Sequence, residues 1–283
     1  MTVTSYVRPG SLPEALDVLD REVESLMVMA GGTTVMPRIN EGVAFPRVVM
    51  SLRQAGLDGL GVEDDVLRIG ATTTLTRLAG QDAIAMLADA ARSTGSWTIR
   101  NLATVGGNLF TPSPGGDVAV ALLALDATVT LASSRGGRTI PLAALSRDAP
   151  GDRLAGDELV VELRVPVPRG PTAFEKLGRK RSDSPAVVTV AAAVRLRDGL
   201  VSEARLALGA MGPHPVRATQ AERALVGSRL DRATIAAAAD AAAEGGEPAT
   251  DAIATGWYRR RMARLVVARV LGRLAAAEVG GRR

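Results

Sequence analysis

The sequence of 283 residues lacks cysteine, and it has one histidine, two lysines, three asparagines and only 2% aromatic residues. Without cysteine the chain cannot form a disulfide, a thiolate metal site or an iron–sulfur cluster held by its own side chains. The single histidine, His214, lies between Pro213 and Pro215 and is interpreted as a turn residue, so a Ser-His-Asp triad and a histidine metal site are disfavoured. Redox chemistry in this chain would therefore need an organic cofactor.

Long apolar runs are also missing, as is an N-terminal signal pattern of charged and then apolar residues. We therefore expect a chain with no transmembrane segment and take the cytoplasm as its compartment. The net charge is +4, from 34 basic and 30 acidic residues. An arginine-rich nucleic-acid-binding module is a remote alternative, because the arginines are dispersed and few aromatics are available to stack on bases.

Two of the three asparagines, Asn101 and Asn108, fall in one stretch around Thr104-Val105-Gly106-Gly107-Asn108. A Gly-Gly pair can adopt positive φ and approach a ligand closely, and successive N–H groups in such a turn can form an anion-binding concavity. The alternative is a tight surface turn. Because asparagine is otherwise so scarce, we interpret the stretch as a ligand-binding loop.

A second glycine turn occurs about seventy residues earlier, where an apolar run at 26–30 leads into Gly31-Gly32-Thr33-Thr34. A strand, a glycine turn and a helix in this order can place backbone donors at a phosphate. The pattern differs from G-x-G-x-x-G, so it does not predict a Rossmann domain. On its own it is equally compatible with an ordinary strand-to-helix turn.

Three charged features are further candidates. Asp117 follows the second glycine pair, and its carboxylate could accept hydrogen bonds from sugar hydroxyls, cap the following helix, or do both. Lys176 and Lys180 are the only lysines among many arginines, which indicates that an ammonium group is specifically required there. The run Arg259–Arg261 could bind phosphate, but a solvated helix face is the favoured interpretation.

Periodicity predicts a mixed first half and a second half of one hairpin followed by helices. Strands are expected at 26–30, 48–52, 66–71, 127–132, 159–165, 186–197 and 200–211, and helices at 11–20, 74–79, 84–91, 119–125, 219–226, 234–243 and 251–278. Asp198-Gly199 between two alternating apolar segments predicts a β-hairpin. Val167–Pro171, rich in proline, predicts a domain boundary.

These residues resemble the FAD-binding medium subunit of molybdenum hydroxylases, the family of the carbon monoxide dehydrogenase flavoprotein and of the flavin domain of xanthine dehydrogenase. The resemblance rests on Ala30–Thr33, on Ile99–Asn108, and on Ala121–Ala127 beyond Asp117. It continues through Phe174-Glu175-Lys176, through 209–218, and to Tyr258-Arg259. It thus spans nearly the whole chain.

The resemblance implies an α+β fold. A FAD-binding domain of the vanillyl-alcohol-oxidase-like type would cover 1–168, in subdomains 1–55 and 56–168. A domain of the carbon monoxide dehydrogenase flavoprotein type would follow at 169–283, with a small antiparallel sheet packed by C-terminal helices. The implied cofactor is non-covalent FAD, with Val28–Val35 around its diphosphate. The implied FAD contacts are Val28, Met29, Ala30, Gly31, Gly32, Thr33, Thr34, Val35, Thr104, Gly106, Gly107, Asn108, Asp117 at the sugar portion, Val160 near the ring and Lys176 beside the flavin.

The resemblance also implies partners: a large molybdenum–pterin subunit and a small subunit with [2Fe–2S] clusters, assembled as a dimer of heterotrimers. This chain would be an oxidoreductase subunit without acid–base or metal-binding side chains of its own. It would pass electrons to NAD⁺, a quinone or oxygen. The alternative is a stand-alone FAD-dependent oxidase or reductase. The substrate of the complex and the electron acceptor do not follow from this sequence.

Overall fold

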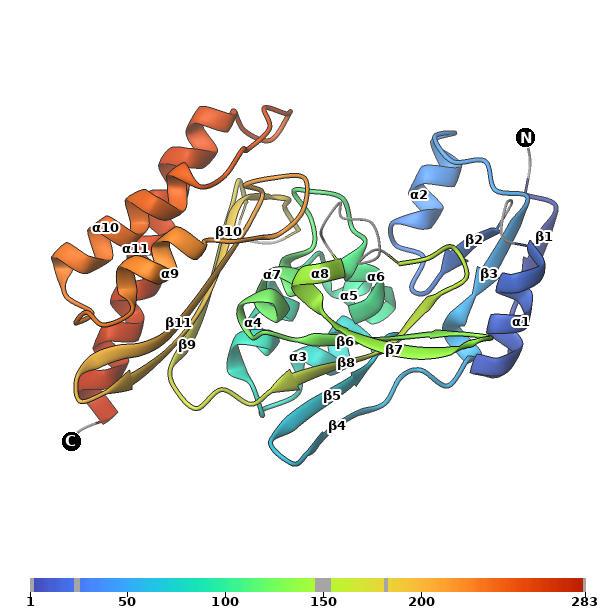
Figure 1. The fold of residues 1–283 in the computed structure, drawn as a ribbon. Coiled ribbons are helices and arrows are strands. Elements are labelled where there is room, and N and C mark those ends of the chain that lie inside the picture. The colour runs from blue at the N-terminus through green and yellow to red at the C-terminus, as the bar shows by residue number, and fades with distance from the viewer. Residues whose placement is uncertain (1–2, 23–25, 146–153, 181–182, 282–283) are drawn as a thin grey trace. The chain divides into compact units, whose positions relative to one another are not determined.

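The computed structural model describes residues 3–22, 26–145, 154–180 and 183–281. Their architecture is α+β, as predicted, and they form two compact units (Figure 1). The first unit consists of Met1–Leu78, Trp97–Thr111 and Ala127–Pro166, and the second of Ala79–Ser96, Pro112–Asp126 and Val167–Arg283. Residues 1, 2, 282 and 283, at the ends of the predicted domains, lie outside the described residues.

The first unit begins with a small parallel sheet in the order β1-β3-β2 (Figure 1). Its strands are β1 (Ser5–Val7), β2 (Leu26–Met29) and β3 (Val48–Ser51), and the helices of this region are α1 (Leu12–Glu22) and α2 (Val35–Asn40). Ala15 and Leu19 on one face of α1 pack with Met50 and Leu52, so helical spacing of apolar residues buries the sheet on that side. The strands predicted at 26–30 and 48–52 and the helix predicted at 11–20 are confirmed, whereas β1 was not predicted.

A five-stranded antiparallel sheet completes the first unit, in the order β4-β5-β8-β6-β7. Its strands are β4 (Leu60–Glu63), β5 (Val66–Gly70), β6 (Thr128–Ser133), β7 (Gly136–Pro141) and β8 (Leu159–Pro166), and the neighbouring helices are α3 (Leu75–Ala79), α5 (Trp97–Leu102), α6 (Val105–Leu109) and α8 (Leu142–Leu145). Alternation places Leu67 and Ile69 in the core, whereas Arg68 pairs with Glu63 and Glu162 on the open face. The edge strands β4 and β7 were not predicted from the sequence.

The second unit contains an antiparallel sheet in the order β12-β11-β10-β9, from β9 (Thr172–Gly178), β10 (Ala186–Arg197), β11 (Leu200–Gly209) and β12 (Val216–Arg217). The predicted hairpin is confirmed. Asp198 and Gly199, between β10 and β11, have φ values of 55° and 76°. Positive φ at both central residues is what a type I′ turn requires.

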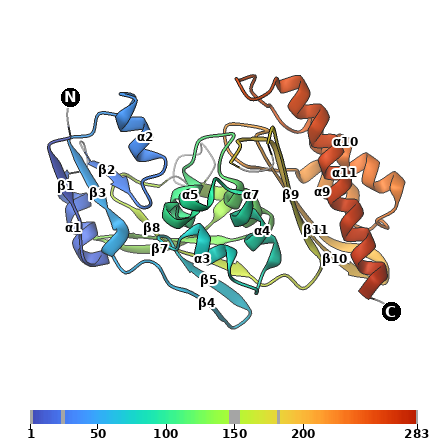
Figure 2. The same ribbon diagram turned by 180° about the vertical axis from the view of Figure 1, so that it is seen from behind.

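Helices cover both faces of this sheet. The helices α9 (Thr219–Leu225), α10 (Arg232–Glu244) and α11 (Gly256–Gly281) lie on one face, and α4 (Ala85–Ser93) and α7 (Asp117–Ala124) lie on the other (Figure 2). Residues 186–192 of β10 are consequently all buried. The alternation predicted for this strand is therefore wrong over its first half, since a strand covered on both faces reads as a continuous apolar run. Among the described helices, none combines the length and apolarity needed to cross a membrane.

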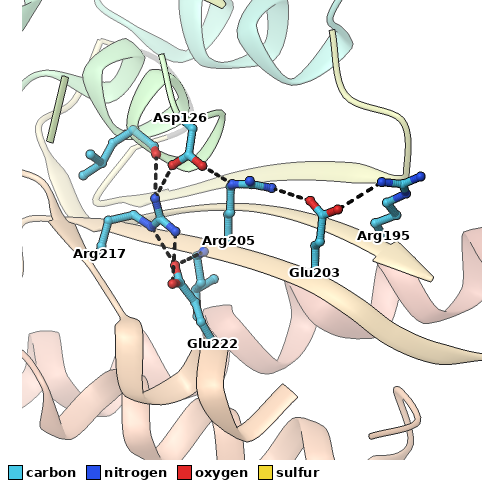
Figure 3. Close-up of polar contacts among 8 residues, drawn as sticks. Asp126, Arg195, Glu203, Arg205, Arg217 and Glu222 are labelled. Carbon is cyan, nitrogen blue, oxygen red and sulfur yellow. Dashed lines mark hydrogen bonds and ion pairs between the residues drawn. The ribbon is translucent and has the colours of Figure 1, made fainter. Parts of the chain in front are cut away.

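A chain of ion pairs holds the carboxyl end of α7 against this sheet (Figure 3). Arg217 donates to Asp126 at 2.5 Å and to Glu222 at 2.6 Å, and Arg205 joins Asp126 to Glu203. Burial disfavours the charged form of Arg217, but Glu222 and Asp126 outweigh it and raise the pKa of the guanidinium. The segment that contains α7 is thus fixed to the second unit by charge as well as by apolar packing.

Candidate cofactor site

The first glycine turn lies between β2 and α2, as the sequence predicts. Gly32 has a φ of 77°, a left-handed conformation that favours glycine. A Cβ atom on Gly31 would lie 2.0 Å from the backbone oxygen of Leu102. The first glycine is therefore required by close backbone packing and the second by conformation.

The backbone donors of this turn have no partner among the residues that the structure describes. Within the described residues, no hydrogen-bond acceptor is found for the N–H groups of Gly32, Thr33 and Thr34. Gly32 and Thr33 line a pocket of about 340 Å³. Polar backbone groups are nearly always paired in folded proteins, so unpaired donors at a cavity indicate a site for an acceptor ligand.

The pocket is built by four segments of the first unit. They come from the end of β2 and the start of α2, from β1 and the end of β3, and from α5. The lining residues are Tyr6, Met29, Ala30, Gly31, Gly32, Thr33, Met36, Pro37, Ser51, Arg53, Ile99 and Leu102. The wall is apolar apart from Ser51, Thr33, Tyr6 and Arg53, as is typical of pockets for organic cofactors.

The second glycine pair has a different conformation from the one predicted. Neither Gly106 nor Gly107 has a positive φ, and both belong to the short helix α6. A Cβ atom on Gly106 would lie 2.8 Å from the backbone oxygen of Ala71, which also accepts the N–H of Gly106. The pair therefore lies in a short helix rather than in a loop, and close packing against the Ala71 backbone is what requires Gly106.

The other polar groups of this segment are used to begin α6. The hydroxyl of Thr104 accepts the N–H of Gly107 at 3.1 Å, which is an N-cap, and Thr104 and Asn108 are buried. Gly107 is the partly exposed member of the four predicted residues. A Cβ atom there would meet only the Thr104 hydroxyl, at 3.0 Å.

The two glycine segments are neighbours. Gly31 packs against the backbone of Leu102 and Ala103, and Thr104 follows directly in the chain. The predicted proximity of the two segments is therefore found within the first unit. Val160, on β8 of the same unit, is buried with 6% of its surface exposed.

Asp117 and Lys176 belong to the second unit, where they form a buried ion pair. Nζ of Lys176 lies 2.6 Å from Oδ2 of Asp117 and also donates to the backbone oxygen of Ser93. The hydroxyl of Thr189 donates to Oδ1 of Asp117 at 2.8 Å. Asp117 is the first residue of α7, and the N-cap is Gly116 rather than Asp117. Thr189 was not among the predicted residues, because nothing local in the sequence links it to a carboxylate 72 residues away.

The remaining candidates are structural. His214 is exposed in the turn between β11 and β12, as predicted. Arg259 is 1% exposed and donates to the backbone oxygens of Ala186 and Val187 and to Asp251. The solvated-face interpretation is therefore wrong for Arg259. Searched over the described residues alone, the chain has no group of three or more potential metal-ligating side chains.

Comparison with known proteins identifies the family. Residues 2–168 match the family described as the FAD binding domain in molybdopterin dehydrogenase. The chain belongs to this family. Residues 172–274 match the CO dehydrogenase flavoprotein C-terminal domain. The FAD-binding family resemblance and the α+β fold inferred from sequence are thereby confirmed, and the chain is an oxidoreductase subunit by family.

The relatives cover almost the full chain. The 6-hydroxypseudooxynicotine dehydrogenase complex subunit alpha of Paenarthrobacter nicotinovorans is 33% identical over 95% of this chain and 93% of its own length. The carbon monoxide dehydrogenase medium chain of Hydrogenophaga pseudoflava is 31% identical over 94% and 95%. A solved structure of carbon monoxide dehydrogenase from that organism, which lacks the Mo-pyranopterin moiety, superposes with a TM-score of 0.90 at 31% identity. It covers 96% of this chain and 97% of its own.

Proposed function

We propose that this chain binds one FAD non-covalently and is the electron-transfer subunit of a molybdenum-containing hydroxylase complex. The observation that carries the proposal is the glycine turn of the first unit. Its N–H donors at Gly32 and Thr33 have no acceptor in the described part of the chain, and both residues line a pocket of about 340 Å³. A diphosphate supplies the acceptors that these donors lack.

The chain's residues have distinct roles in this proposal. The segment Val28–Val35 wraps the diphosphate, and Thr104, Gly106, Gly107 and Asn108 shape the adjoining wall. Asp117 lies at the sugar portion, Val160 near the ring and Lys176 beside the flavin. We assign these contacts to a FAD-binding domain at 1–168, in subdomains 1–55 and 56–168, and to a C-terminal domain at 169–283.

The protein contributes binding, orientation and electrostatics, whereas FAD supplies the ability to link one-electron and two-electron carriers. The ion pair and the Ser93 carbonyl hold the Lys176 ammonium in one position. A fixed cation beside the flavin favours its reduced, anionic form. A midpoint potential that stays unchanged in Lys176→Gln would contradict this role.

The partners in the proposal are a large molybdenum–pterin subunit and a small [2Fe–2S] subunit, in a cytoplasmic dimer of heterotrimers. The acceptor is NAD⁺, a quinone or oxygen. The names of the relatives support this assembly, because they describe a subunit of a dehydrogenase complex and a medium chain. The absence of cysteine is consistent with iron–sulfur clusters on another chain.

The purified chain tests the proposal directly. We expect a yellow protein whose flavin is released by acid as FAD, and an apoprotein that regains the flavin absorbance band on reconstitution. Gly107→Asp should abolish FAD retention by placing a carboxylate at the partly exposed position of α6. A folded, colourless protein that binds no FAD would refute FAD binding. Purification as a lone, catalytically active monomer would instead support the stand-alone oxidase or reductase.

A further inference from the structure

Twelve described residues line the pocket at the first glycine turn, and Arg53 is the one that carries a charge. Its backbone N–H donates to the hydroxyl of Ser51 at 3.5 Å, but its guanidinium has no hydrogen bond or ion pair to the described residues. None of the roles assigned above involves this side chain. Arg53 is exposed at this pocket, so its guanidinium is solvated and available to an anionic ligand.

The fold places Arg53 beside the glycine turn for a topological reason. Met29, the last residue of β2, is paired in register with Ser51, the last residue of β3. The two parallel strands therefore end at the same edge of the sheet, where Gly31 and Arg53 each follow two residues later. Leu52 is buried in the core under α1 and anchors the short 3₁₀ turn Leu52–Gln54 that bears Arg53.

The chemistry of the pocket favours an anionic ligand with a flat apolar part. The lining contains no carboxylate, one guanidinium and the unpaired N–H groups of Gly32 and Thr33. Met29, Met36 and the ring of Tyr6 provide apolar and polarizable surface. The volume of about 340 Å³ lies at the small end of organic-ligand pockets, which run from about 300 to about 1,000 Å³, and so suits part of a dinucleotide.

From this geometry we propose that Arg53 binds a phosphate of the adenosine diphosphate half of FAD. It is a positioning residue that makes the chain select FAD over flavins without that half. The inference rests on the proposed function and adds to it the residue that supplies positive charge at the diphosphate. Neutral N–H donors alone orient a phosphate, whereas a guanidinium also binds it with charge-assisted, geometrically specific hydrogen bonds.

The test compares Arg53→Gln with a matched control, Arg47→Gln. Arg47 is exposed and directly precedes β3, at the opposite end of the strand from Arg53, and it does not line the pocket. The apoproteins of the full wild-type chain and of each variant are titrated with FAD and with riboflavin, and flavin fluorescence reports binding. ADP binding is measured by its competition with FAD. Far-ultraviolet circular dichroism verifies that each variant is folded.

We expect Arg53→Gln to raise the dissociation constant for FAD about tenfold, the range of one hydrogen bond to a charged group. The competition constant of ADP should rise by the same factor, and riboflavin binding should stay unchanged. Arg53→Lys should recover part of the lost FAD affinity, and its FAD affinity should depend more steeply on salt than that of Arg53→Gln. Arg47→Gln should match the wild type.

The outcomes separate the two proposals. Wild-type apoprotein that binds no FAD refutes the proposed function and the role of Arg53 together. Normal FAD binding by the wild type with equal constants in Arg53→Gln and Arg47→Gln overturns the role of Arg53 alone. The role of Arg53 is also overturned if ADP binds the FAD-loaded chain through Arg53 without displacing FAD. The pocket would then serve a separate nucleotide.

Discussion

Nζ of Lys176 lies 2.6 Å from Oδ2 of Asp117, in a buried ion pair that joins β9 to the first turn of α7. The hydroxyl of Thr189 satisfies the second carboxylate oxygen. Removing one member of a buried pair leaves the other charge uncompensated, which costs about 3–5 kcal/mol. We therefore expect Lys176→Met to lower the free energy of unfolding by about that amount, as measured by urea denaturation.

The only other lysine provides the control for this prediction. Lys180 is exposed, so Lys180→Met should change the free energy of unfolding by less than about 0.5 kcal/mol. The double variant Lys176→Met, Asp117→Asn should lose less than the sum of the two single losses, because it buries no unpaired charge. Additive losses would show that the two side chains are not energetically coupled.

Gly31 tests whether close packing at the first glycine turn is essential. A Cβ atom there would lie 2.0 Å from the Leu102 oxygen, whereas a Cβ atom on Gly61 in β4 would meet nothing within 4 Å. We expect Gly31→Ala to destabilise the chain by about 1–3 kcal/mol, the cost of overpacking, and to eliminate FAD retention. Gly61→Ala should be neutral or slightly stabilising. Equal effects of the two variants in thermal unfolding and flavin content would refute this reading of the turn.

The two glycine segments show what a sequence can and cannot reveal. The first turn was predictable because its signals are local: an apolar strand runs directly into Gly31-Gly32 before a helix. In the second, composition identified an unusual stretch, but the glycine requirement comes from Ala71, which is distant in the chain. A glycine that is needed for positive φ and a glycine that is needed because a Cβ atom has no space cannot be distinguished from the sequence.

Other differences have similar causes. The strands β4 and β7 are short, largely exposed edge strands, so they lack the apolar alternation that identifies a strand. The lack of alternation in β10 depends on α7, which comes from a distant part of the chain. Asp117 and Lys176 were each singled out from the sequence, but their pairing across 59 residues was not predictable. Local patterns thus revealed the elements and candidate residues, whereas the contacts between them required the fold.

Glu158 makes the stability of the first unit depend on pH. Its two carboxylate oxygens accept hydrogen bonds from Arg138 at 2.6 and 2.8 Å, and one also accepts the N–H of Ala155. The hydrogen bonds from Arg138 hold the pKa of Glu158 below its ordinary value of 4.5, against the opposing effect of burial. Because the folded pKa is the lower one, this stabilisation is present above the unfolded pKa and is lost as pH falls through the folded pKa.

We therefore expect Glu158→Gln to lower the free energy of unfolding at neutral pH by about 1–3 kcal/mol. The difference from the wild type should shrink as the pH falls below the ordinary carboxyl pKa of 4.5 and through the lower folded pKa, because the wild-type carboxylate then becomes protonated. Urea titrations across this range measure it. Asp17→Asn, which removes an exposed i,i+4 pair worth about 0.3–0.5 kcal/mol, is the control. A constant difference at all pH values would refute the ionic role of Glu158.

Arg259 and Arg264 lie on the same helix, α11, and each forms an ion pair, but the Arg259 side chain is buried and the Arg264 side chain is exposed. Arg259 anchors the start of α11 to β10 through two backbone oxygens, and it binds both oxygens of Asp251 at 2.8 Å. Arg264 pairs with Asp240 at the surface, where each side chain is more than half exposed. In Arg259→Met the two oxygens of β10 lose the guanidinium donor, and the Asp251 carboxylate loses its ion pair but keeps the N–H donors of Ile253 and Ala254. We therefore expect a loss of about 3–5 kcal/mol in the free energy of unfolding. Arg264→Met should cost less than about 1 kcal/mol, because solvent screens an exposed pair.

Since α11 covers the sheet of the second unit, hydrogen exchange should rise in β10 for Arg259→Met and stay at the wild-type level for Arg264→Met. Similar losses in the two variants would mean that burial does not determine the strength of these arginine contacts.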